Sequence, residues 1–479
     1  MTEQIKVLST PKYNGKYLGN SLQEAIPPAF SDDQLIQVLS NIPQVPDSLE
    51  LLSDEERVEE QMKIKSFIVP TTQFFNIYND IRHLILNGYE QRNPVLATTV
   101  EWTFDIALNG ISNEAVQSTT ADSMFICGIS GMGKSTLVGI ILKSCFPQVI
   151  CHPTIPNIIN PQITWIKFDI PADAARSSVC MAFFKAVDNV LNRLDFLEDK
   201  PSFQKQYKGK KIEEMQDGMA LICVTYNIGI IVIDELQRLN VAKSGGEKVV
   251  LQFFDDLSNA VKAPILKIAT PASLKLFSNK FETGRRTATS FLYELAPLNQ
   301  DSMDWKYISE ILWSYQLTKK HMPYSPDISD CLYELSAGIV SCLSRLIKLA
   351  NIDAIRTGTE EVTTQSLKKT FNSQFGLLKE AIEAIKSGNK ENYDDLMLLA
   401  ELDQENGKNR IKELKKLLAG NNLTGQAAKA FQETVEDIES SHILDDKDKV
   451  YLKKLKAELN HAIEQNKSPI VTNHKGESQ

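Results

Sequence analysis

The chain has 479 residues, a length that accommodates roughly two to four domains of ordinary size. Hydrophobic residues make up 42% and charged residues 24% of it, which is typical of a folded globular protein and excludes a largely disordered one. The 52 basic and 61 acidic side chains give a net charge of −9, which excludes a protein that coats nucleic acid through its overall positive charge. Any contact with nucleic acid must therefore come from a local basic patch.

The cysteines and the apolar segments indicate a cellular compartment. Seven cysteines occur without Cys-x-x-Cys spacing, so we expect reduced thiols rather than disulfides or a zinc site. The first residues lack the apolar core of a signal sequence, and no run of about 18 apolar residues is present. We therefore expect neither a secreted nor a membrane-spanning protein, and we place it in the cytosol.

The N-terminal part divides into two segments. Residues 1–65 contain a proline pair at Pro27-Pro28 and an acidic run at 54–56, which predicts an irregular segment. We expect it to bind a partner as a small adaptor, with a loosely docked arm as the alternative. Residues 66–115 carry apolar side chains at helical spacing, including Phe74 and Leu84, and predict an N-terminal helical part of the next domain.

Between residues 116 and 300, short apolar runs alternate with helix-like segments. Continuous apolar strands that alternate with helices predict a parallel sheet covered on both faces. The predicted strands are 124–127, 163–166, 230–233, 264–269 and 291–295, and the predicted helices are 136–145, 176–194, 212–226 and 247–261.

The distribution of proline predicts that the last third of the chain is helical. Eighteen of the 19 prolines lie at or before Pro326, and the next is Pro469. Because proline breaks helix interiors, we expect helices in 301–375 and a helical C-terminal extension in 376–479. Apolar stripes at 411–418 and 452–463 are typical of packing in a core or against a partner helix.

A phosphate-binding loop directly follows the first predicted strand. The stretch 128–136 reads G-I-S-G-M-G-K-S-T and fits G-x-x-x-x-G-K-[ST] between a strand and a helix. Such a loop wraps backbone N–H groups around phosphates at the positive end of the next helix. The predicted nucleotide-binding residues are Gly128, Ser130, Gly131, Met132, Gly133, Lys134, Ser135 and Thr136. Lys134 would reach the β- and γ-phosphates, and the Ser135 hydroxyl would bind Mg²⁺.

Two adjacent acids follow the aliphatic strand 230–233. Asp234 lies at the carboxyl end of that strand, where open α/β sheets bind ligands, and we expect it to hold the Mg²⁺. Glu235 is suited to orient and deprotonate the attacking water. A plain helix N-cap is the alternative reading of this pair. Together with the phosphate loop, the pair favours nucleotide hydrolysis over nucleotide binding alone.

Three further residues are weaker candidates for catalysis. Thr270 follows the strand 265–269, which we expect to lie beside the strand that ends at Asp234. Its hydroxyl could bind the γ-phosphate or the attacking water, or Thr270 could form only a turn before Pro271. Arg285 or Arg286 could donate positive charge to the γ-phosphate of a neighbouring subunit. The alternative is a pair of surface arginines that contact an acidic helix.

Three stretches carry a resemblance to a known family. They are 67–72 together with 88–94, the phosphate loop 128–136, and IIVIDELQRL at 230–239. On these residues the sequence resembles the AAA+ ATPases, and specifically the TnsC/TniB family of transposition regulators, over about residues 66–350. The resemblance implies an α/β fold: an AAA+ P-loop NTPase with a parallel sheet flanked by helices, a helical lid and a helical C-terminal extension.

The resemblance also implies a function. Subunits with bound ATP and Mg²⁺ would form a homo-oligomer, a ring or a helical filament, on duplex DNA with little sequence preference. The assembly would link a target-selector protein or an RNA-guided complex to the transposase, and ATP hydrolysis would disassemble it. Its location would be the bacterial cytosol, in association with the nucleoid.

The family pattern assigns further residues by resemblance. Tyr89, Arg92 and Pro94 match the segment that cradles adenine, and Arg345 matches the sensor-II region, although it lies further beyond Gly338 than is common. The family contacts DNA between its second strand and the acidic pair, and the basic residues in that interval here are Lys205, Lys208, Lys210 and Lys211. Simple solvation of these lysines is the alternative.

Two other classes of protein stay open on chemistry alone. One is a replication-initiator or helicase-loader ATPase, which often adds a winged helix, and residues 376–479 show no pattern of that kind. The other is a signalling NTPase that uses nucleotide as a switch. That class tends to carry long repeat arrays, and we find no repeat in the sequence.

Overall fold

The computed structural model describes most of the first 386 residues. The described ranges are 5–17, 19–109, 122–155, 158–172, 174–197, 200–239, 243–271 and 291–386, with the single residues Val435, Lys453, Lys456 and Ala457 beyond them. Contacts divide the chain into two units, Met1–Gln374 and Phe375–Gln479. The stripes predicted at 411–418 and 452–463, Arg285 and Arg286 lie outside the described residues, apart from Lys453, Lys456 and Ala457 of the second stripe.

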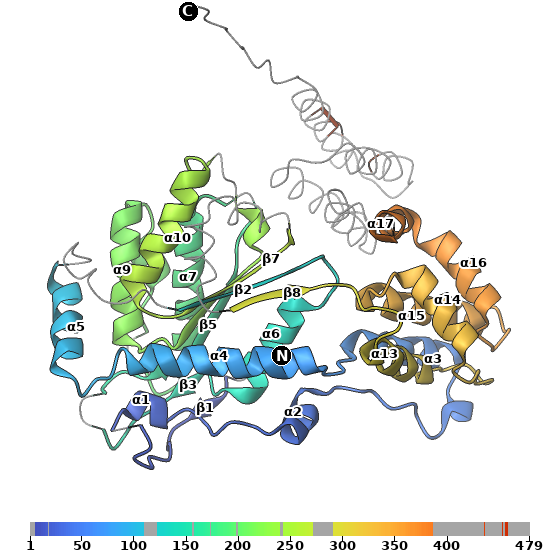
Figure 1. The fold of residues 1–479 in the computed structure, drawn as a ribbon, viewed down its shortest axis with the longest axis horizontal. Helices are drawn as coiled ribbons and strands as arrows, with labels where there is room; N and C mark the ends of the chain where they lie inside the picture. Colours follow the sequence, from blue (N-terminus) through green and yellow to red (C-terminus); the bar gives the residue numbers. More distant parts are fainter. Residues whose placement is uncertain are drawn as a thin grey trace, which may run out of the picture. The chain divides into compact units, whose positions relative to one another are not determined.

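A five-stranded parallel sheet forms the centre of the first unit (Figure 1). Its order is β5-β6-β7-β2-β8, and every neighbouring pair is parallel. The strands are β2 (Ser123–Gly128), β5 (Trp165–Asp169), β6 (Ile230–Asp234), β7 (Ile265–Ala269) and β8 (Phe291–Leu295). The five predicted strands are confirmed. The run predicted at 163–166 proves to be two elements, because β4 (Gln162–Ile163) pairs with a smaller sheet of β1 (Val7–Leu8) and β3 (Val149–Ile150).

Helices cover both faces of the sheet, and each face has its own apolar core (Figure 1). One core joins alternate strand residues such as Phe125 and Ile231 to α7, α9 and α10, and the other joins Met124 and Val232 to α4 and α6. These helices are α4 (Thr72–Glu90), α6 (Lys134–Cys145), α7 (Arg176–Leu191), α9 (Ile212–Thr225) and α10 (Glu247–Val261). Burial on both faces explains why β2, β6 and β7 are mostly apolar instead of alternating, with Lys267 of β7 as a buried exception.

Four lid helices follow β8. They are α13 (Met303–Ser314), α14 (Pro326–Ser336), α15 (Val340–Arg356) and α16 (Thr364–Gln374), and they pack on one another. The second unit begins with α17 (Gly376–Lys386). Within the described residues no single helix is long and apolar enough to cross a bilayer, whereas α14 and α15, bent by 115° at the break between them, pass by length and composition only as a pair.

The N-terminal segment is more regular than the sequence predicted. It contains α1 (Ser21–Glu24), α2 (Asp32–Leu39) and α3 (Asp54–Gln61), with 3-10 turns at η1 (Leu49–Leu51) and η2 (Met62–Ser66). Ser31 with Gln34, and Ser53 with Glu56, form capping boxes that start α2 and α3. Both boxes are visible in the sequence as Ser-x-x-Gln and Ser-x-x-Glu, so the expectation of an irregular segment was wrong for a reason that could have been recognised.

The two halves of this segment pack against different parts of the first unit. Leu22 and Leu35, from α1 and α2, are buried in the core that contains α4 and α6. The second half, α3 with η2, packs on lid helix α15. Tyr315 after α13 donates from its hydroxyl to Glu60 O (3.0 Å), and the rings of Phe67 and Tyr315 meet edge to face at 5.2 Å. Residues 19–66 therefore form a strap that connects the sheet domain to the lid.

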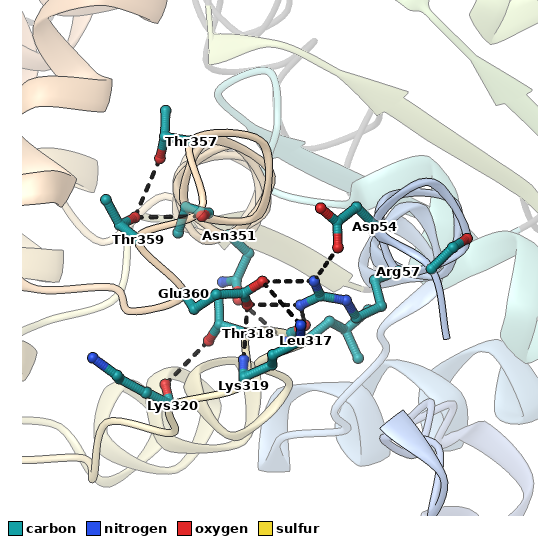
Figure 2. Close-up of polar contacts among 12 residues, drawn as sticks. Asp54, Arg57, Leu317, Thr318, Lys319, Lys320, Asn351, Thr357, Thr359 and Glu360 are labelled. Carbon is teal, nitrogen blue, oxygen red and sulfur yellow. Dashed lines mark hydrogen bonds and ion pairs between the residues drawn. The ribbon is translucent and has the colours of Figure 1, made fainter. Parts of the chain in front are cut away.

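A buried arginine fixes this strap to the lid (Figure 2). Arg57 is fully buried, and its guanidinium donates to both oxygens of Glu360 (2.6 and 2.7 Å), to Asp54 (2.6 Å) and to Leu317 O (3.0 Å). Glu360 lies in the loop after α15 with a φ of 55° and also accepts from Lys319 N (3.0 Å). The bond from Arg57 lowers the pKa of Glu360 and keeps it ionised.

Replacing Arg57 by alanine should destabilise the first unit by about 3 kcal/mol, because it leaves the mostly buried Glu360 carboxylate without its main partner. Chemical denaturation would measure the change. Lys319→Ala is the matched control, since the Lys319 ammonium lies 4.0 Å from the same carboxylate but is half-exposed, and it should cost less than about 1 kcal/mol. Equal effects of the two variants would contradict the role given to Arg57.

Candidate functional site

The phosphate loop connects β2 to α6 at the carboxyl edge of the sheet. β2 ends at Gly128 and α6 begins at Lys134, with Gly131 and Gly133 at φ values of 81° and 80°. A side chain at Gly131 would also collide with Ser341 of lid helix α15, because an added Cβ would lie 2.2 Å from its Oγ. Glycine is thus required here both by the backbone conformation and by the close approach of the lid.

Lys134 is folded back onto its own loop. Its ammonium donates to Gly128 O (2.6 Å) and Ile129 O (2.9 Å). These carbonyls hold the charge over the loop, at the positive end of α6, which is where a phosphate would be received. Ser135 is the second residue of α6 and is half-buried, so its side chain lies at the same end of the helix.

The strand order brings the predicted catalytic residues to the same edge of the sheet. β7 lies between β2 and β6, so Thr270 after β7 is placed between the phosphate loop and Asp234. Adjacent strands are about 4.8 Å apart, which puts the ends of β2 and β6 about 10 Å apart. Thr270 and Asp234 are both buried, with about 2% of each exposed. The sequence prediction that the Thr270 strand neighbours the Asp234 strand is confirmed.

Asp234 is held by two partners. Its Oδ1 accepts from Glu235 N (2.8 Å), and its Oδ2 accepts from Lys167 Nζ on the neighbouring strand β5 (2.7 Å). Lys167 also approaches Asp169 Oδ1 at 3.3 Å. Burial lowers the pKa of Lys167, but Asp234 and Asp169 together outweigh it and raise the pKa, so this lysine stays charged. The sequence analysis missed Lys167, because nothing in a lysine on a predicted strand indicates which carboxylate faces it.

Glu235 has an unusual backbone. Its φ of 59° is left-handed, which is uncommon for a residue with a side chain and is found disproportionately at functional sites. Its carboxylate accepts from Gln237 Nε2 (2.8 Å) and pairs with Arg238 Nε (3.0 Å). The pair Asp234–Glu235 therefore ends a strand and begins the 3-10 turn η4 (Leu236–Arg238), with the two side chains held by different neighbours.

The residues present fit a magnesium nucleotide. A buried carboxylate and a hydroxyl at the end of a phosphate loop are the hard oxygen ligands that Mg²⁺ prefers, with its remaining positions filled by water and phosphate oxygens. Within the described part of the chain no cluster of three or more His, Cys, Asp or Glu side chains is placed to bind a metal by itself. Asp234 and Ser135 would thus hold the ion jointly with the nucleotide.

The prediction that Tyr89 and Arg92 cradle adenine is wrong. Both side chains are buried at the amino end of β6, on the opposite edge of the sheet from the phosphate loop. The Tyr89 hydroxyl donates to Asn227 O (2.9 Å), and Arg92 donates to Ile228 O (2.7 Å). They fasten the end of α4 to the sheet. Pro94 follows at the same end, four residues after the last residue of α4.

A different cavity adjoins the phosphate loop. It has a volume of about 220 Å³. It is lined by the phosphate loop with the start of α6, by residues 64–74 where the strap leads into α4, by residues 295–298 at the end of β8, and by lid helices α13 and α15. Its walls are mostly apolar, and Lys65, Thr71, Ser341 and Ser344 supply polar groups. The segment 67–72, which carried the family resemblance, lines this cavity.

Arg345 and the four lysines are placed as follows. Arg345 on α15 donates to Gln374 O of α16 (3.1 Å). The lysines lie on and after α8 (Phe203–Gln206) and are all exposed. Lys210 pairs with Glu214 (3.0 Å), and Lys211 N donates to the same carboxylate. The segment is anchored to α7, because Asp188 accepts from Phe203 N and Gln204 N and Tyr207 stacks on Phe184 at 4.4 Å.

Comparison with known proteins finds one family model that matches part of the chain. Residues 117–277 match the model of the AAA domain. The chain has the AAA+ P-loop fold: a parallel five-stranded sheet flanked by helices, with additional helices at the C-terminus. No curated protein sequence matches the chain.

Among solved structures, three similar ones illustrate the range. The Drosophila ORC bound to DNA matches at 11% identity and a TM-score of 0.39, over 94% of this chain and 99% of that one. A Walker-type ATPase of Pyrococcus abyssi matches at 15% identity and a TM-score of 0.35, over 70% of this chain and 91% of that one. The RuvB Holliday junction branch migration motor of Thermotoga maritima matches at 16% identity and a TM-score of 0.30, over 61% of this chain and 77% of that one.

Proposed function

We propose that this chain is a magnesium-dependent ATPase that assembles on duplex DNA and regulates DNA transposition. The observation that carries the ATPase part is the convergence of Lys134, Thr270, Asp234 and Glu235 at one edge of the sheet. The transposition part depends on the resemblance of 67–72 with 88–94, 128–136 and 230–239 to the TnsC/TniB family.

Each residue has a defined task in this proposal. The loop amides and Lys134 hold the β- and γ-phosphates, and bound Mg²⁺ neutralises charge that develops on them. Asp234 orients the waters of the ion, and Glu235 accepts a proton from the attacking water. Thr270, between them, orients that water or the γ-phosphate. Arg285 or Arg286 would act on the nucleotide of a neighbouring subunit.

We propose that the cavity of about 220 Å³ receives the base of the nucleotide. It opens beside Gly131–Gly133, and its walls come from the sheet domain, the strap and the lid. Apolar walls with a few polar groups are typical of sites for flat heterocycles. Because both the strap and the lid form these walls, a bound nucleotide would hold them together. Arg345 remains a proposed sensor on the lid.

Lys167 should set the magnesium requirement of this site. Its ammonium competes with the ion for Asp234, so Lys167→Gln should lower the Mg²⁺ concentration for half-maximal ATP hydrolysis by about threefold to tenfold. The measurement is a Mg²⁺ titration at saturating ATP, with binding of a fluorescent ADP followed in parallel. A higher Mg²⁺ requirement in the variant would show instead that Lys167 supports the geometry of Asp234.

We propose that duplex DNA is contacted by Lys205, Lys208, Lys210 and Lys211. They are exposed on a segment that Asp188 and Phe184 anchor to α7, so an oligomer would present one such basic patch from each subunit. Residues 1–65 and 376–479 are the proposed contact regions for a target selector, or an RNA-guided complex, and for transposase subunits. The protein would be located in the bacterial cytosol, in association with the DNA of the nucleoid.

Charge reversal at Lys205, Lys208 and Lys211 should reduce the slope of log affinity for DNA against log salt by about 2 to 3. Binding would be measured by fluorescence anisotropy with a labelled duplex of arbitrary sequence and a slowly hydrolysed ATP analogue. Lys210 is left unchanged because Glu214 already pairs with it, so Lys210→Glu alone serves as the weaker control. An unchanged slope in the triple variant would move the DNA contact to other residues.

A further inference from the structure

A second cavity of the first unit lies along β5, the edge strand farthest from β8 in the sheet. Its volume is about 1080 Å³. Residues of α7 form one wall, and the opposite wall includes Lys143 at the end of α6 and Lys6 beside β1. Four residues of β5 also line the cavity: Trp165, Lys167, Phe168 and Asp169. We call this cavity the β5 groove.

The β5 groove is strongly basic. The cations that line it include Lys6, Lys143, Lys167, Lys185, Arg193 and Lys208, with Lys210 at its rim already paired to Glu214. Asp169 is the acidic side chain among its lining residues, and Lys167 already approaches it. In a chain of net charge −9, a cavity with this imbalance attracts an anionic ligand.

The strand beneath the groove has an open hydrogen-bonding edge. Thr164 O accepts from Ile230 N and Ile170 N donates to Asp234 O, so the even-numbered residues here bond to β6. Because backbone groups alternate in direction along a strand, the N–H and C=O groups of Lys167 and Asp169 face the other way. Within the described residues β5 is the last strand on that side, and Gln148 Nε2 reaches Trp165 O at 3.5 Å near its start.

The wall formed by α7 mixes cations with apolar groups. Ser177, Met181, Lys185 and Asn189 follow one another at intervals of four residues and thus share one helix face. Ala182, Ala186 and Met215 add apolar surface to the same cavity. A DNA backbone has no donors for the strand carbonyls and gains little from apolar walls, whereas an extended peptide can use both.

We propose that the β5 groove binds an acidic, extended peptide segment of a partner protein, which adds a strand to the open edge of β5. Its main chain would pair with the Lys167 and Asp169 backbone groups, and its acidic side chains would meet Lys185, Arg193 and Lys143. Its alternate side chains would rest on Met181 and Ala182. Strand addition of this kind derives affinity from main-chain bonds and specificity from side-chain pockets.

A labelled peptide of about ten residues that alternates glutamate and valine would serve as the probe. We expect it to bind the full chain with salt-dependent affinity, and the matched peptide of alternating glutamine and valine to bind at least about tenfold more weakly. Two further versions of the peptide would carry methyl groups on either the odd-numbered or the even-numbered backbone nitrogens. One of these two registers should abolish binding, because only alternate N–H groups of an added strand face β5. Equal binding of the two peptides, no binding of either, or indifference to methylation in both registers would overturn the proposal.

The variant Lys185→Glu with Arg193→Glu tests the location. Both side chains are exposed on or just after α7, so the fold should persist, which a thermal melt would confirm. We expect at least about a tenfold loss of peptide affinity, and no loss in the control Lys306→Glu with Lys368→Glu on lid helices. Unchanged peptide affinity would overturn the location.

DNA binding separates this proposal from the proposed function. If Lys185→Glu with Arg193→Glu spared the peptide and weakened binding of a labelled duplex, the groove would belong to DNA and the peptide proposal would fail. Loss of peptide binding alone, with ATP hydrolysis and DNA affinity retained, is the predicted result. The ATPase assignment does not depend on either outcome.

Discussion

Lys134→Ala should abolish ATP binding at concentrations that saturate the unchanged protein. The Lys134 ammonium donates hydrogen bonds to Gly128 O and Ile129 O. From this position in the phosphate loop it can turn to bind the phosphates of a nucleotide. Losing two charged hydrogen bonds to phosphate costs about 3 kcal/mol or more, equivalent to about a 100-fold loss of affinity. Calorimetric titration with a slowly hydrolysed ATP analogue would measure this.

The control for this variant is Lys369→Ala. Lys369 is an exposed lysine of lid helix α16, and its replacement changes the net charge by the same amount. It should bind ATP as the unchanged protein does. Normal affinity in Lys134→Ala would refute the assignment of the phosphate loop, whereas loss of affinity in both variants would indicate a general charge effect.

Glu235→Gln should bind ATP normally and hydrolyse it about 10²- to 10⁴-fold more slowly, since the amide cannot take a proton from water. The substitution keeps the side-chain shape and leaves an oxygen that can still accept from Gln237 or Arg238. Steady-state phosphate release would give the rate, and sedimentation would show assemblies on DNA that persist. Glu213→Gln, on the exposed side of α9, is the control.

A different result for Glu235 would redefine the site. If Glu235→Gln turned over ATP at the unchanged rate, Glu235 would be only the residue that starts the turn η4, with its φ of 59° a consequence of that turn. If the variant lost ATP binding as well, the pairing of Glu235 with Arg238 would be needed for binding, because the released guanidinium could disturb the site.

The sheet and the phosphate loop could be predicted because local sequence determines them. Strands buried on both faces are mostly apolar, so β2, β6 and β7 stood out, and a glycine-rich loop between strand and helix has few alternatives. The position of Thr270 beside Asp234 followed from the same alternation of strands and helices.

Contacts between distant segments could not be predicted in this way. Lys167 meets Asp234 across 67 residues, and Arg57 meets Glu360 across 303 residues. The spacing of these residues carries no periodic signal, and a buried arginine is indistinguishable in sequence from an exposed one. Tyr89 and Arg92 failed for a related reason: a motif gives the order of residues, whereas the edge of the sheet that they reach depends on the direction of α4.

The most direct test of the central claim is an experimental structure of the chain with Mg²⁺, a slowly hydrolysed ATP analogue and duplex DNA. We predict that the triphosphate lies against Lys134, with the metal between Ser135 and Asp234 and the base in the cavity beside Phe67. We also predict that several copies of the chain surround the duplex. A nucleotide bound elsewhere, or a monomer unaffected by nucleotide and DNA, would contradict the account.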